Sequence, residues 1–411
     1  MSQHNAPFIT VGLPVHNGMP YLPETMESLL AQTYSEFEIL AIDDGSTDSS
    51  LEYLRSVRDP RLRVISQENR GITAALNRML AEVKSPWLAR HDADDVAYPP
   101  RLARTVEHIQ AHPDAGMFYS LAEYYPIGSF GRFRSTRGTP EQIRELVLSG
   151  YLPAICHPTV TLNVAKVVGI GGYRFNLHVE DVDLWWRMAL RHDIRLIPEV
   201  LVGFRQNVQS VSSKNLATQA VNYLYIQYLL LSQLRGVQPL GCDEVRSILM
   251  SMHDSGRFEF KTHMRAFNME LGKGNKVKAL YRAARAFAAS PSAFLRRTLD
   301  EFGRERMVHG GEPMAMFVKY EKELWPAARV EDSSELEIAG MLFPSVHVHI
   351  LAGSSGPAQG AIAFAPFHLL IRGQKHVAHI VKRRVDVDHR VPARLPQVQL
   401  LVQRAGEVRV P

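Results

Sequence analysis

The chain has few cysteines and no long uninterrupted apolar run. Among 411 residues only Cys156 and Cys242 are cysteines, which excludes a disulfide framework and a cysteine metal site and fits a reducing compartment. The longest apolar segment, YLYIQYLLLSQL at 223–234, contains glutamine and serine. It is too short and too polar to span a bilayer, so it is either a buried helix or a helix on a membrane surface.

The chain also lacks a strong surplus of charge. Its formal net charge is +5, which is mild for this length, and we expect no nucleic-acid partner. The excess lies in 372–409, where nine Lys and Arg residues face three acids. VKRR at 381–384 is interpreted as a solvated face, with contact to anionic lipid or a phosphorylated acceptor as the alternative.

The first residues contain no basic region followed by an apolar stretch, so we expect no secretory signal. The expected location is cytoplasmic, with peripheral contact at the inner face of the membrane as an alternative.

Strand and helix patterns alternate through the first quarter of the chain. Apolar, β-branched runs predict strands, and apolar residues at helical spacing predict helices. The expected strands lie at 8–15, 37–44, 61–67 and 86–92, and the expected helices at 19–33, 50–57 and 71–84. This alternation predicts an α/β fold with a mostly parallel sheet and helices on both faces.

The later part of the chain has a less regular pattern. Helices are expected at 139–150 and 179–192, an extended segment at 154–163, and a mainly helical region from 216 to 306. Short strand-like runs follow residue 340. At roughly 150 residues per domain, the length allows two or three domains.

RHDADDVAYPPR at 90–101 places Asp92, Asp94 and Asp95 directly after a predicted buried strand. Carboxylates are the ligands that hard cations such as Mg²⁺ prefer, together with substrate phosphates. The alternative is a solvated turn with a helix cap, because aspartate is common in both. Ligands on parallel sheets bind at the carboxyl ends of the strands, which is where this cluster is expected.

Two further segments end predicted strands in the same way. In IDDGSTDSS, Asp43 and Asp44 could hydrogen-bond a base edge or a ribose hydroxyl, or they could belong to a turn that caps the next helix. In QENRGITAALN, Arg70 could contact a phosphate, and Gly71 lets backbone come close. An ordinary entry into a helix is the alternative.

VEDVDLWWRMALR at 179–191 begins a predicted helix with acids. Asp181 near the helix N-terminus would be held ionised by the helix dipole and could accept a proton from a hydroxyl nucleophile. The alternative is that Glu180, Asp181 and Asp183 only stabilise the helix start. Trp185 is either a packing residue or a surface on which a sugar stacks.

The order of these segments resembles the family-2 glycosyltransferases of the GT-A fold. The matching blocks are PVHNG, QTYSEFEILAIDDGSTDSS, NRGITAALN, ARHDADDVAYPPRL and GGYR…VEDVDLWWRMA, within residues 7–212. The resemblance implies inverting, metal-dependent transfer of a sugar from a nucleotide-sugar donor, with a UDP-sugar favoured. The acceptor would be a hydroxyl of a glycan, of a lipid-linked molecule or of another compound.

On the donor side, the resemblance implies base contacts from one group of residues and nucleotide contacts from another. These are Pro14, His16, Asn17, Asp43 and Asp44 around the base, Arg70 and Gly71 near the nucleotide, and Asp92 at the sugar or ribose. Mn²⁺ or Mg²⁺ would be held by Asp94 or Asp95. His16 stands where family members often have an aromatic residue.

On the acceptor side, Asp181 matches the catalytic base of the family. His157, Glu180 and Trp185 would lie near the acceptor. FRQNVQSVS resembles a family segment that contains a histidine, and Asn207 stands in the place of that histidine. The absence of a Gln-x-x-Arg-Trp block argues for transfer of single sugars.

The resemblance predicts a catalytic GT-A domain at 1–215, a helical region at 216–310 and a C-terminal region of uncertain fold at 311–411. It also suggests the synthesis of cell-envelope or exported glycans. Two alternatives are a nucleotidyltransferase and a non-catalytic nucleotide-sugar-binding protein. The first would need a Gly-rich, basic loop after the first strand, which the sequence lacks, and the complete set of acids argues against the second.

Overall fold

The computed structural model describes most of the chain up to residue 326 and a short part beyond it. The described ranges are 8–125, 133–205, 216–252, 255–272, 274–295, 308–326, 367–371 and 374–378. Two compact units are present, Met1–Val330 and Glu331–Pro411. In the second unit, β11 (Phe367–Ile371) and β12 (Gln374–Ala378) form an antiparallel pair. Asn207 and VKRR at 381–384 lie outside the described residues.

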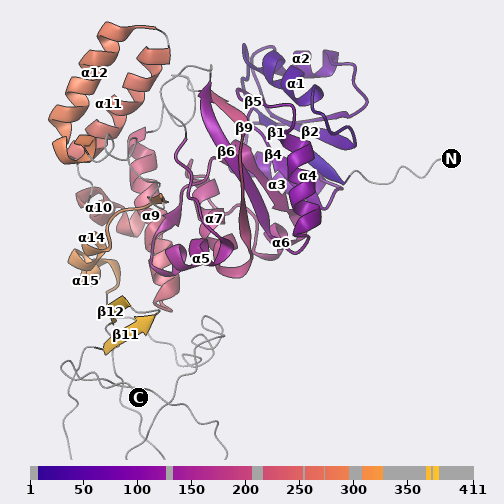
Figure 1. Ribbon diagram of the computed structural model, residues 1–411. Helices are drawn as coiled ribbons and strands as arrows, with labels where there is room; N and C mark the ends of the chain where they lie inside the picture. The colour runs from indigo at the N-terminus through magenta and orange to yellow at the C-terminus, as the bar shows by residue number, and fades with distance from the viewer. Residues whose placement is uncertain are drawn as a thin grey trace, which may run out of the picture. The chain divides into compact units, whose positions relative to one another are not determined.

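An eight-stranded sheet forms the centre of the first unit (Figure 1), with the order β3-β2-β1-β4-β8-β6-β9-β5. Its strands are β1 (Ile9–Val15), β2 (Phe37–Asp44), β3 (Leu62–Gln67), β4 (Trp87–Arg90), β5 (Val96–Ala97), β6 (Met117–Tyr125), β8 (Val160–Asn163) and β9 (Ile194–Arg205). β8 is antiparallel to β4 and β6, and β5 is antiparallel to β9. All the other pairings are parallel. A separate short pair joins β7 (Leu152–Pro153) to β10 (His309–Gly310).

Alternation of side chains along the strands divides the core into two layers. In β2, Ile39 and Ala41 belong to one hydrophobic cluster, and Leu40 and Ile42 belong to the other. The first cluster includes buried residues of α1 (Leu22–Leu30), α2 (Ser50–Ser56) and α4 (Arg101–Ala111). The second includes buried residues of α3 (Ile72–Glu82), α5 (Pro140–Leu148), α6 (Val164–Gly169) and α7 (Glu180–Arg191). Helices therefore cover both faces of the sheet, as predicted.

The predicted fold class, a GT-A-like α/β fold followed by a mainly helical region, is confirmed. The strands and helices expected before residue 93 all form, with ends that differ by a few residues. By contrast, α4, β6 and β9 were not predicted. Met117–Ala122 of β6 is buried on both faces, and an apolar run of that kind has no period that distinguishes a strand from a helix.

The carboxyl ends of the parallel strands meet at one rim of the sheet. The strands that point this way end at Val15, Asp44, Gln67, Arg90, Tyr125 and Arg205. The segments that the sequence singled out after β1 to β4 therefore lie along this rim. The ends of β6 and β9 add Tyr125 and Arg205, to which the sequence analysis assigned no role.

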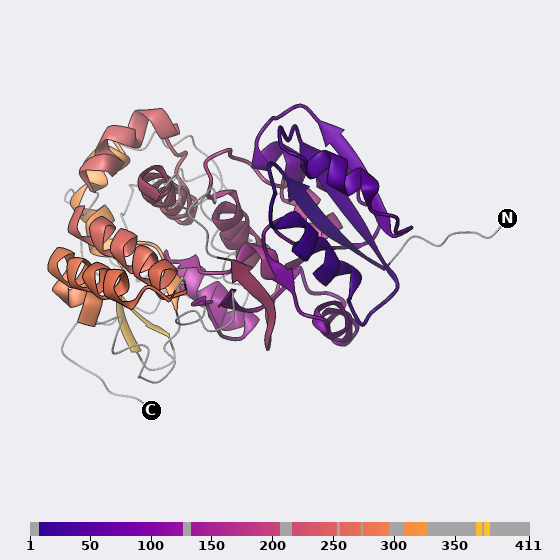
Figure 2. The same cartoon turned by 90° about the horizontal axis from the view of Figure 1, so that it is seen from above.

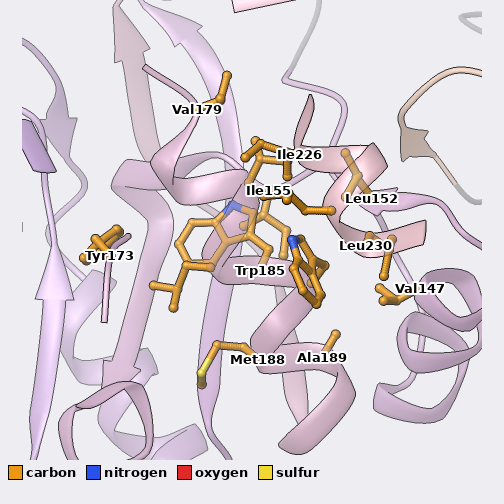
Figure 3. Packing of buried hydrophobic residues seen from close by; sticks show 14 of the residues in the cluster. Val147, Leu152, Ile155, Tyr173, Val179, Trp185, Met188, Ala189, Ile226 and Leu230 are labelled. Carbon is orange, nitrogen blue, oxygen red and sulfur yellow. The ribbon is translucent and has the colours of Figure 1, made fainter. Parts of the chain in front are cut away.

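The segment at 223–234 belongs to α9 (Leu216–Leu234) and is buried, which decides between its two predicted alternatives. Ile226 and Leu230 pack in one cluster with Trp185 and Met188 of α7 and Val147 of α5 (Figure 3). Helix α9 is therefore part of the core that supports α7.

Polar side chains inside α9 find partners in neighbouring segments. The Nε2 group of Gln227 donates to the carbonyls of Gly150 and Glu312 at 3.0 and 2.9 Å. Further helices follow, namely α10 (Cys242–Ser251), α11 (Ser255–Gly272), α12 (Lys276–Ala289), α14 (Met314–Lys319) and α15 (Glu321–Leu324). In the described ranges, no helix has the length and apolarity needed to cross a membrane.

Candidate active site

The acid loop at Asp92–Asp95 follows β4 and is held from two sides. The hydroxyl of Thr25 in α1 donates to the carbonyls of Ala93 and Asp95 at 3.1 and 2.8 Å. From β9, the backbone N–H of Arg205 donates to Oδ1 of Asp95 at 2.7 Å, and Nε of Arg205 donates to the Asp94 carbonyl at 2.7 Å. These bonds fix the backbone that presents the three carboxylates.

Arg205 is itself held in a cluster of aromatic and acidic side chains. Its guanidinium lies 4.6 Å from the centre of the Tyr21 ring and 4.7 Å from that of Tyr125, both within the range of cation–π attraction. It also forms an ion pair with Glu24, which accepts a 2.6 Å hydrogen bond from the Tyr125 hydroxyl. Arg205 ends the last strand of this rim and lies in the segment FRQNVQSVS, but the sequence analysis assigned it no role.

Arg90, the last residue of β4, places a buried positive charge beside the acid loop. Its side chain is only 3% exposed, and Nη1 lies 2.5 Å from Oδ1 of Asp92. A second buried arginine, Arg101 of α4, donates to the Arg90 carbonyl at 2.5 Å and lies 2.8 Å from Nδ1 of His91. These two arginines could not be distinguished from surface arginines in the sequence, because burial of a charge leaves no periodic pattern.

Burial and mutual repulsion act together on the acid loop. Burial raises the pKa of Asp94 to about 6, and the charge of Asp92 adds to the effect, while Arg90 opposes it. Burial and the charges of Asp94 and Asp92 also raise the pKa of Asp95 well above its usual range. A positive charge placed near this loop would therefore stabilise the ionised carboxylates.

The residues of this loop fit a divalent cation only in combination with a ligand. Within the described ranges no three His, Cys, Asp or Glu side chains are placed to hold one ion. However, Oδ2 of Asp95 is buried without a hydrogen-bond partner among the residues that the structure describes, and Asp94 is half-buried beside it. One or two carboxylates completed by substrate phosphates is the arrangement that Mg²⁺ usually adopts.

Glu180 and Asp181 begin α7 and face the same charges as the acid loop. Burial raises the pKa of Glu180 to about 8, with a further contribution from the charge of Asp181. Burial raises the pKa of Asp181 to about 6. Two groups oppose this effect, namely the Val182 N–H, which donates to Oδ1 of Asp181 at 2.8 Å, and the charge of Arg90. The charge of Asp92 acts on both residues. Two neighbouring carboxyls with separated pKa values are typical of acid and base roles.

Asp183, two residues later, has a different environment. Its buried carboxylate is ion-paired with Arg174 at 2.6 Å and Arg187 at 2.8 Å. By contrast, Oε2 of Glu180 is buried with no hydrogen-bond partner in the described part of the chain. The first turn of α7 thus contains one structural acid, Asp183, and two acids that face the rim.

His157 lies on the same side as α7, in the short 3₁₀ turn η1 (His157–Thr159). Its Nε2 is 3.0 Å from the Tyr173 hydroxyl, and its ring meets the Trp185 ring edge-on at 5.4 Å between centroids. Burial, then the charge of Arg90, lowers the pKa of His157 well below its usual range, so the ring is neutral.

Trp185 is fully buried in the core (Figure 3). Its ring has no exposed face on which a sugar could stack in this structure. The buried position of Trp185 therefore favours the packing interpretation over sugar stacking.

On the donor side of the rim, Asp44 holds the loop that begins α3. Its carboxylate accepts hydrogen bonds from Gln67 Nε2 at 2.8 Å, from the Arg70 N–H at 3.0 Å and from the Gly71 N–H at 2.9 Å. Gly71 has a φ of 83°, and a Cβ at this position would lie 2.8 Å from Nδ2 of Asn176, which explains the glycine. The Asp44 carboxylate also lies near the N-terminus of α3, where the helix dipole attracts a negative charge.

His16 and Asn17 join the end of β1 to the loop after β2. Nδ1 of His16 donates to the Asp44 carbonyl at 3.0 Å, and Oδ1 of Asn17 accepts from the Thr47 N–H at 2.8 Å. Asp43 is buried and accepts from the Ser66 hydroxyl at 3.0 Å. Pro14 is also buried, whereas His16, Asn17 and Arg70 expose their side chains.

The structure thus brings the sequence-predicted residues to one rim in two groups. Pro14, His16, Asn17, Asp43, Asp44, Arg70 and Gly71 lie at the ends of β1 to β3. The second group consists of Asp92, which is ion-paired with Arg90, and of the residues on whose pKa the charge of Arg90 acts, namely Asp94, Asp95, His157, Glu180 and Asp181. Only Trp185 lies behind the rim, in the core.

Comparison with known proteins places this arrangement in a family. Residues 10–167 match the model of Glycosyl transferase family 2. An uncharacterized glycosyltransferase of Haemophilus influenzae is 35% identical over 221 residues, which make up 51% of this chain and 68% of that protein. The amylovoran biosynthesis glycosyltransferase AmsE of Erwinia amylovora is 27% identical over 205 residues, or 47% of this chain and 73% of that protein.

Among solved structures, residues 1–349 of S. aureus TarS in complex with UDP-GlcNAc are 16% identical, with a TM-score of 0.45, over 68% of this chain and 91% of that one. On the sequence matches, this chain belongs to glycosyl transferase family 2 and is a glycosyltransferase.

Proposed function

We propose that the protein transfers a sugar from a nucleotide-sugar donor, with a UDP-sugar favoured, to an acceptor hydroxyl, with inversion at the anomeric carbon. The observation that carries this proposal is the convergence of two acid groups on one buried cation. Asp92–Asp95 and the Glu180–Asp181 pair come from distant parts of the chain, yet both respond to the charge of Arg90. Residues 1–215 are proposed as the catalytic part.

In this proposal the ends of β1 to β3 bind the nucleotide. The exposed side chains of His16, Asn17 and Arg70 are available to a base and a phosphate. Asp43 and Asp44 keep the loops between them in place through the hydrogen bonds described above. Either carboxylate could also contact the base of the nucleotide while it holds these loops.

Asp94 and Asp95 are proposed to hold a divalent cation, Mn²⁺ or Mg²⁺, together with the donor diphosphate. When bound, such a cation supplies Lewis-acid stabilisation of the charge that develops on the leaving diphosphate. Arg205 supports this chemistry by holding the Asp95 carboxylate through its N–H and the Asp94 carbonyl through its Nε. Asp92, paired with Arg90, is left to face the sugar or the ribose.

Asp181 is proposed as the general base. The acceptor oxygen attacks the anomeric carbon, the bond from that carbon to the diphosphate oxygen breaks, and the bonding electrons leave with the nucleoside diphosphate. The acceptor proton passes to the Asp181 carboxylate, a role typically worth about 10²–10⁴ in rate. Glu180, whose pKa is raised to about 8, is protonated at neutral pH and can donate a hydrogen bond to the acceptor.

The setting of this activity is proposed from the relatives. AmsE carries amylovoran biosynthesis in its name, and a comparable role here would be the synthesis of a cell-envelope or exported glycan. The acceptor would then be a glycan or a lipid-linked molecule. A cytoplasmic location, with access to nucleotide sugars, would suit this role.

A panel of donors tests the proposal. UDP-, GDP- and dTDP-sugars are incubated with the protein and with Mn²⁺, Mg²⁺ or EDTA, and release of nucleoside diphosphate is measured. We expect release from one donor, which EDTA, Asp94→Ala and Asp181→Asn each lower by about 10²-fold or more, whereas Asp114→Ala, an exposed acid outside the rim, has no effect. Release of pyrophosphate from a nucleoside triphosphate would instead indicate a nucleotidyltransferase. Donor binding without turnover of any acceptor would indicate a binding protein.

A further inference from the structure

Helix α12 exposes apolar side chains that an ordinary surface helix would bury. Val277 is 82% exposed, Leu280 is 72% exposed and Tyr281 is 55% exposed. Phe287 and Leu295, further along the same stretch, are also exposed. Elsewhere in the described residues, exposed large apolar side chains occur singly on other helices, as Val168, Met250 and Val318. The gathering on α12 is therefore a surface patch and not scattered exposure.

The exposed residues form one stripe along the helix. Val277, Leu280, Tyr281, Ala284 and Ala288 recur at the spacing that places residues on one face. The opposite face carries Ala279 and Ala286, both fully buried. Helices α11 and α12 lie side by side in both views (Figures 1 and 2). The helix thus packs through its small residues and presents its large apolar ones to solvent.

Basic side chains flank the stripe, and acidic ones are absent from it. Lys276, Lys278 and Arg285 are exposed, and the stretch 274–295 contains no Asp or Glu. Nη1 of Arg285 lies 3.2 Å from the Tyr281 hydroxyl, and the Arg282 guanidinium lies 5.9 Å from the centre of the Tyr281 ring. Large apolar residues between cations on an amphipathic helix match a helix that lies in the interface of an anionic membrane.

We propose that the outer face of α12, formed by Val277, Leu280 and Tyr281 with Lys276, Lys278 and Arg285, docks the protein on an anionic lipid surface. The apolar side chains would enter the headgroup region, and the cations would meet the lipid phosphates. A second copy of this chain would suit the charge pattern less well, because two such basic faces would repel each other. The proposal concerns a surface away from the rim and does not depend on the sugar chemistry.

Sedimentation with vesicles tests this proposal on the full chain. We expect binding to phosphatidylglycerol–phosphatidylcholine vesicles, weak binding to phosphatidylcholine alone, and release by high salt. Leu280→Glu should weaken binding by about tenfold or more, and Lys278→Gln or Arg285→Gln by roughly fivefold each. Val168→Glu and Val318→Glu, at similarly exposed apolar positions outside α12, should leave binding unchanged.

Circular dichroism and donor turnover of Leu280→Glu serve as checks of folding, because this residue is exposed and lies outside the proposed site. Failure of the wild type to bind anionic vesicles would overturn the proposal. Equal loss of binding in Val168→Glu would also overturn it. A dimer in sedimentation equilibrium that Leu280→Glu converts to a monomer would assign this face to a second copy and overturn the membrane assignment.

Discussion

The rim of the sheet buries charged side chains, whereas the outer face of α12 exposes apolar ones. At the rim, Arg90, Asp95 and Glu180 are buried, and Oδ2 of Asp95 and Oε2 of Glu180 lack hydrogen-bond partners among the described residues. On α12, Leu280 and Val277 project into solvent beside lysine and arginine. Burial is unfavourable for the charged side chains at the rim, and exposure to water is unfavourable for the apolar side chains on α12.

The two regions differ in the kind of partner that would stabilise them. Buried carboxylates are stabilised by a cation and by a ligand that brings hydrogen-bond donors. Exposed apolar side chains between basic ones are stabilised by a surface that is both apolar and anionic. We therefore expect a soluble, charged ligand at the rim and lipid at α12.

The largest expected effect is that of Asp181→Asn at the rim. Loss of the general base should lower kcat by about 10²–10⁴ with little change in the KM for the donor. The matched control is Glu180→Gln, which replaces a carboxyl that is already protonated at neutral pH, since its pKa is raised to about 8. This variant should stay within roughly fivefold of wild type. Equal losses in both variants, measured by steady-state kinetics, would contradict the assigned roles.

Arg90→Met should have the next largest effect, and on stability. Removal of the cation leaves buried acids without their counter-charge, and the free energy of unfolding should fall by about 3 kcal/mol. Urea unfolding measures this change. Arg78→Met, in a solvent-exposed ion pair with Glu82, is the control and should change stability by less than about 1 kcal/mol. A change of less than about 1 kcal/mol in the free energy of unfolding of Arg90→Met would show that the buried acids do not need the charge of Arg90.

The pH dependence of turnover gives an intermediate effect. Because burial raises the pKa of Asp181 to about 6, the base is ionised above that pH and protonated below it. The value of kcat/KM should therefore fall about tenfold for each pH unit below 6 and level off above it. In Asp181→Asn the part of this acid limb that comes from Asp181 should disappear, and the fall that remains should be that of Asp94, whose pKa is also raised to about 6. A flat profile between pH 5 and 7.5 for wild type would exclude Asp181 as the base.

The smallest expected effects are those on the stability of α12. Leu280→Glu should change the free energy of unfolding by less than about 0.5 kcal/mol, because the side chain is exposed. Ala279→Leu, one residue earlier but buried against α11, should cost about 1–3 kcal/mol through overpacking. Thermal unfolding of both variants checks the orientation of the helix. A large loss in Leu280→Glu would show that its outer face is covered.

The strands and helices before residue 93 were predictable because their apolar residues recur with the spacing of one kind of element. Gly12 of β1 illustrates how closely these elements pack, since a Cβ there would lie 2.1 Å from the sulfur of Met79 in α3. The rim positions of Asp44, Asp94 and Asp181 were predictable for a simple reason. Each stands directly after a recognisable strand or at the start of a recognisable helix.

The sequence did not predict the residues that support those acids. Arg90, Arg101 and Arg205 look like surface residues in the sequence, because arginine is usually exposed. Their burial depends on long-range contacts, such as the bond from the Arg205 N–H to Asp95, that only the assembled sheet creates. For Trp185 the sequence left two alternatives, and its buried position distinguishes them.

Calorimetric titration of UDP into the protein, with and without Mn²⁺, tests the proposed nucleotide and metal site at the rim most directly. We expect Mn²⁺ to strengthen UDP binding by about tenfold or more, and we expect this gain to disappear in Asp94→Ala but to persist in Asp114→Ala. No binding of UDP, GDP or dTDP with or without Mn²⁺ would contradict a nucleotide site at the rim, and a full Mn²⁺ effect in Asp94→Ala would contradict the role of the acid loop.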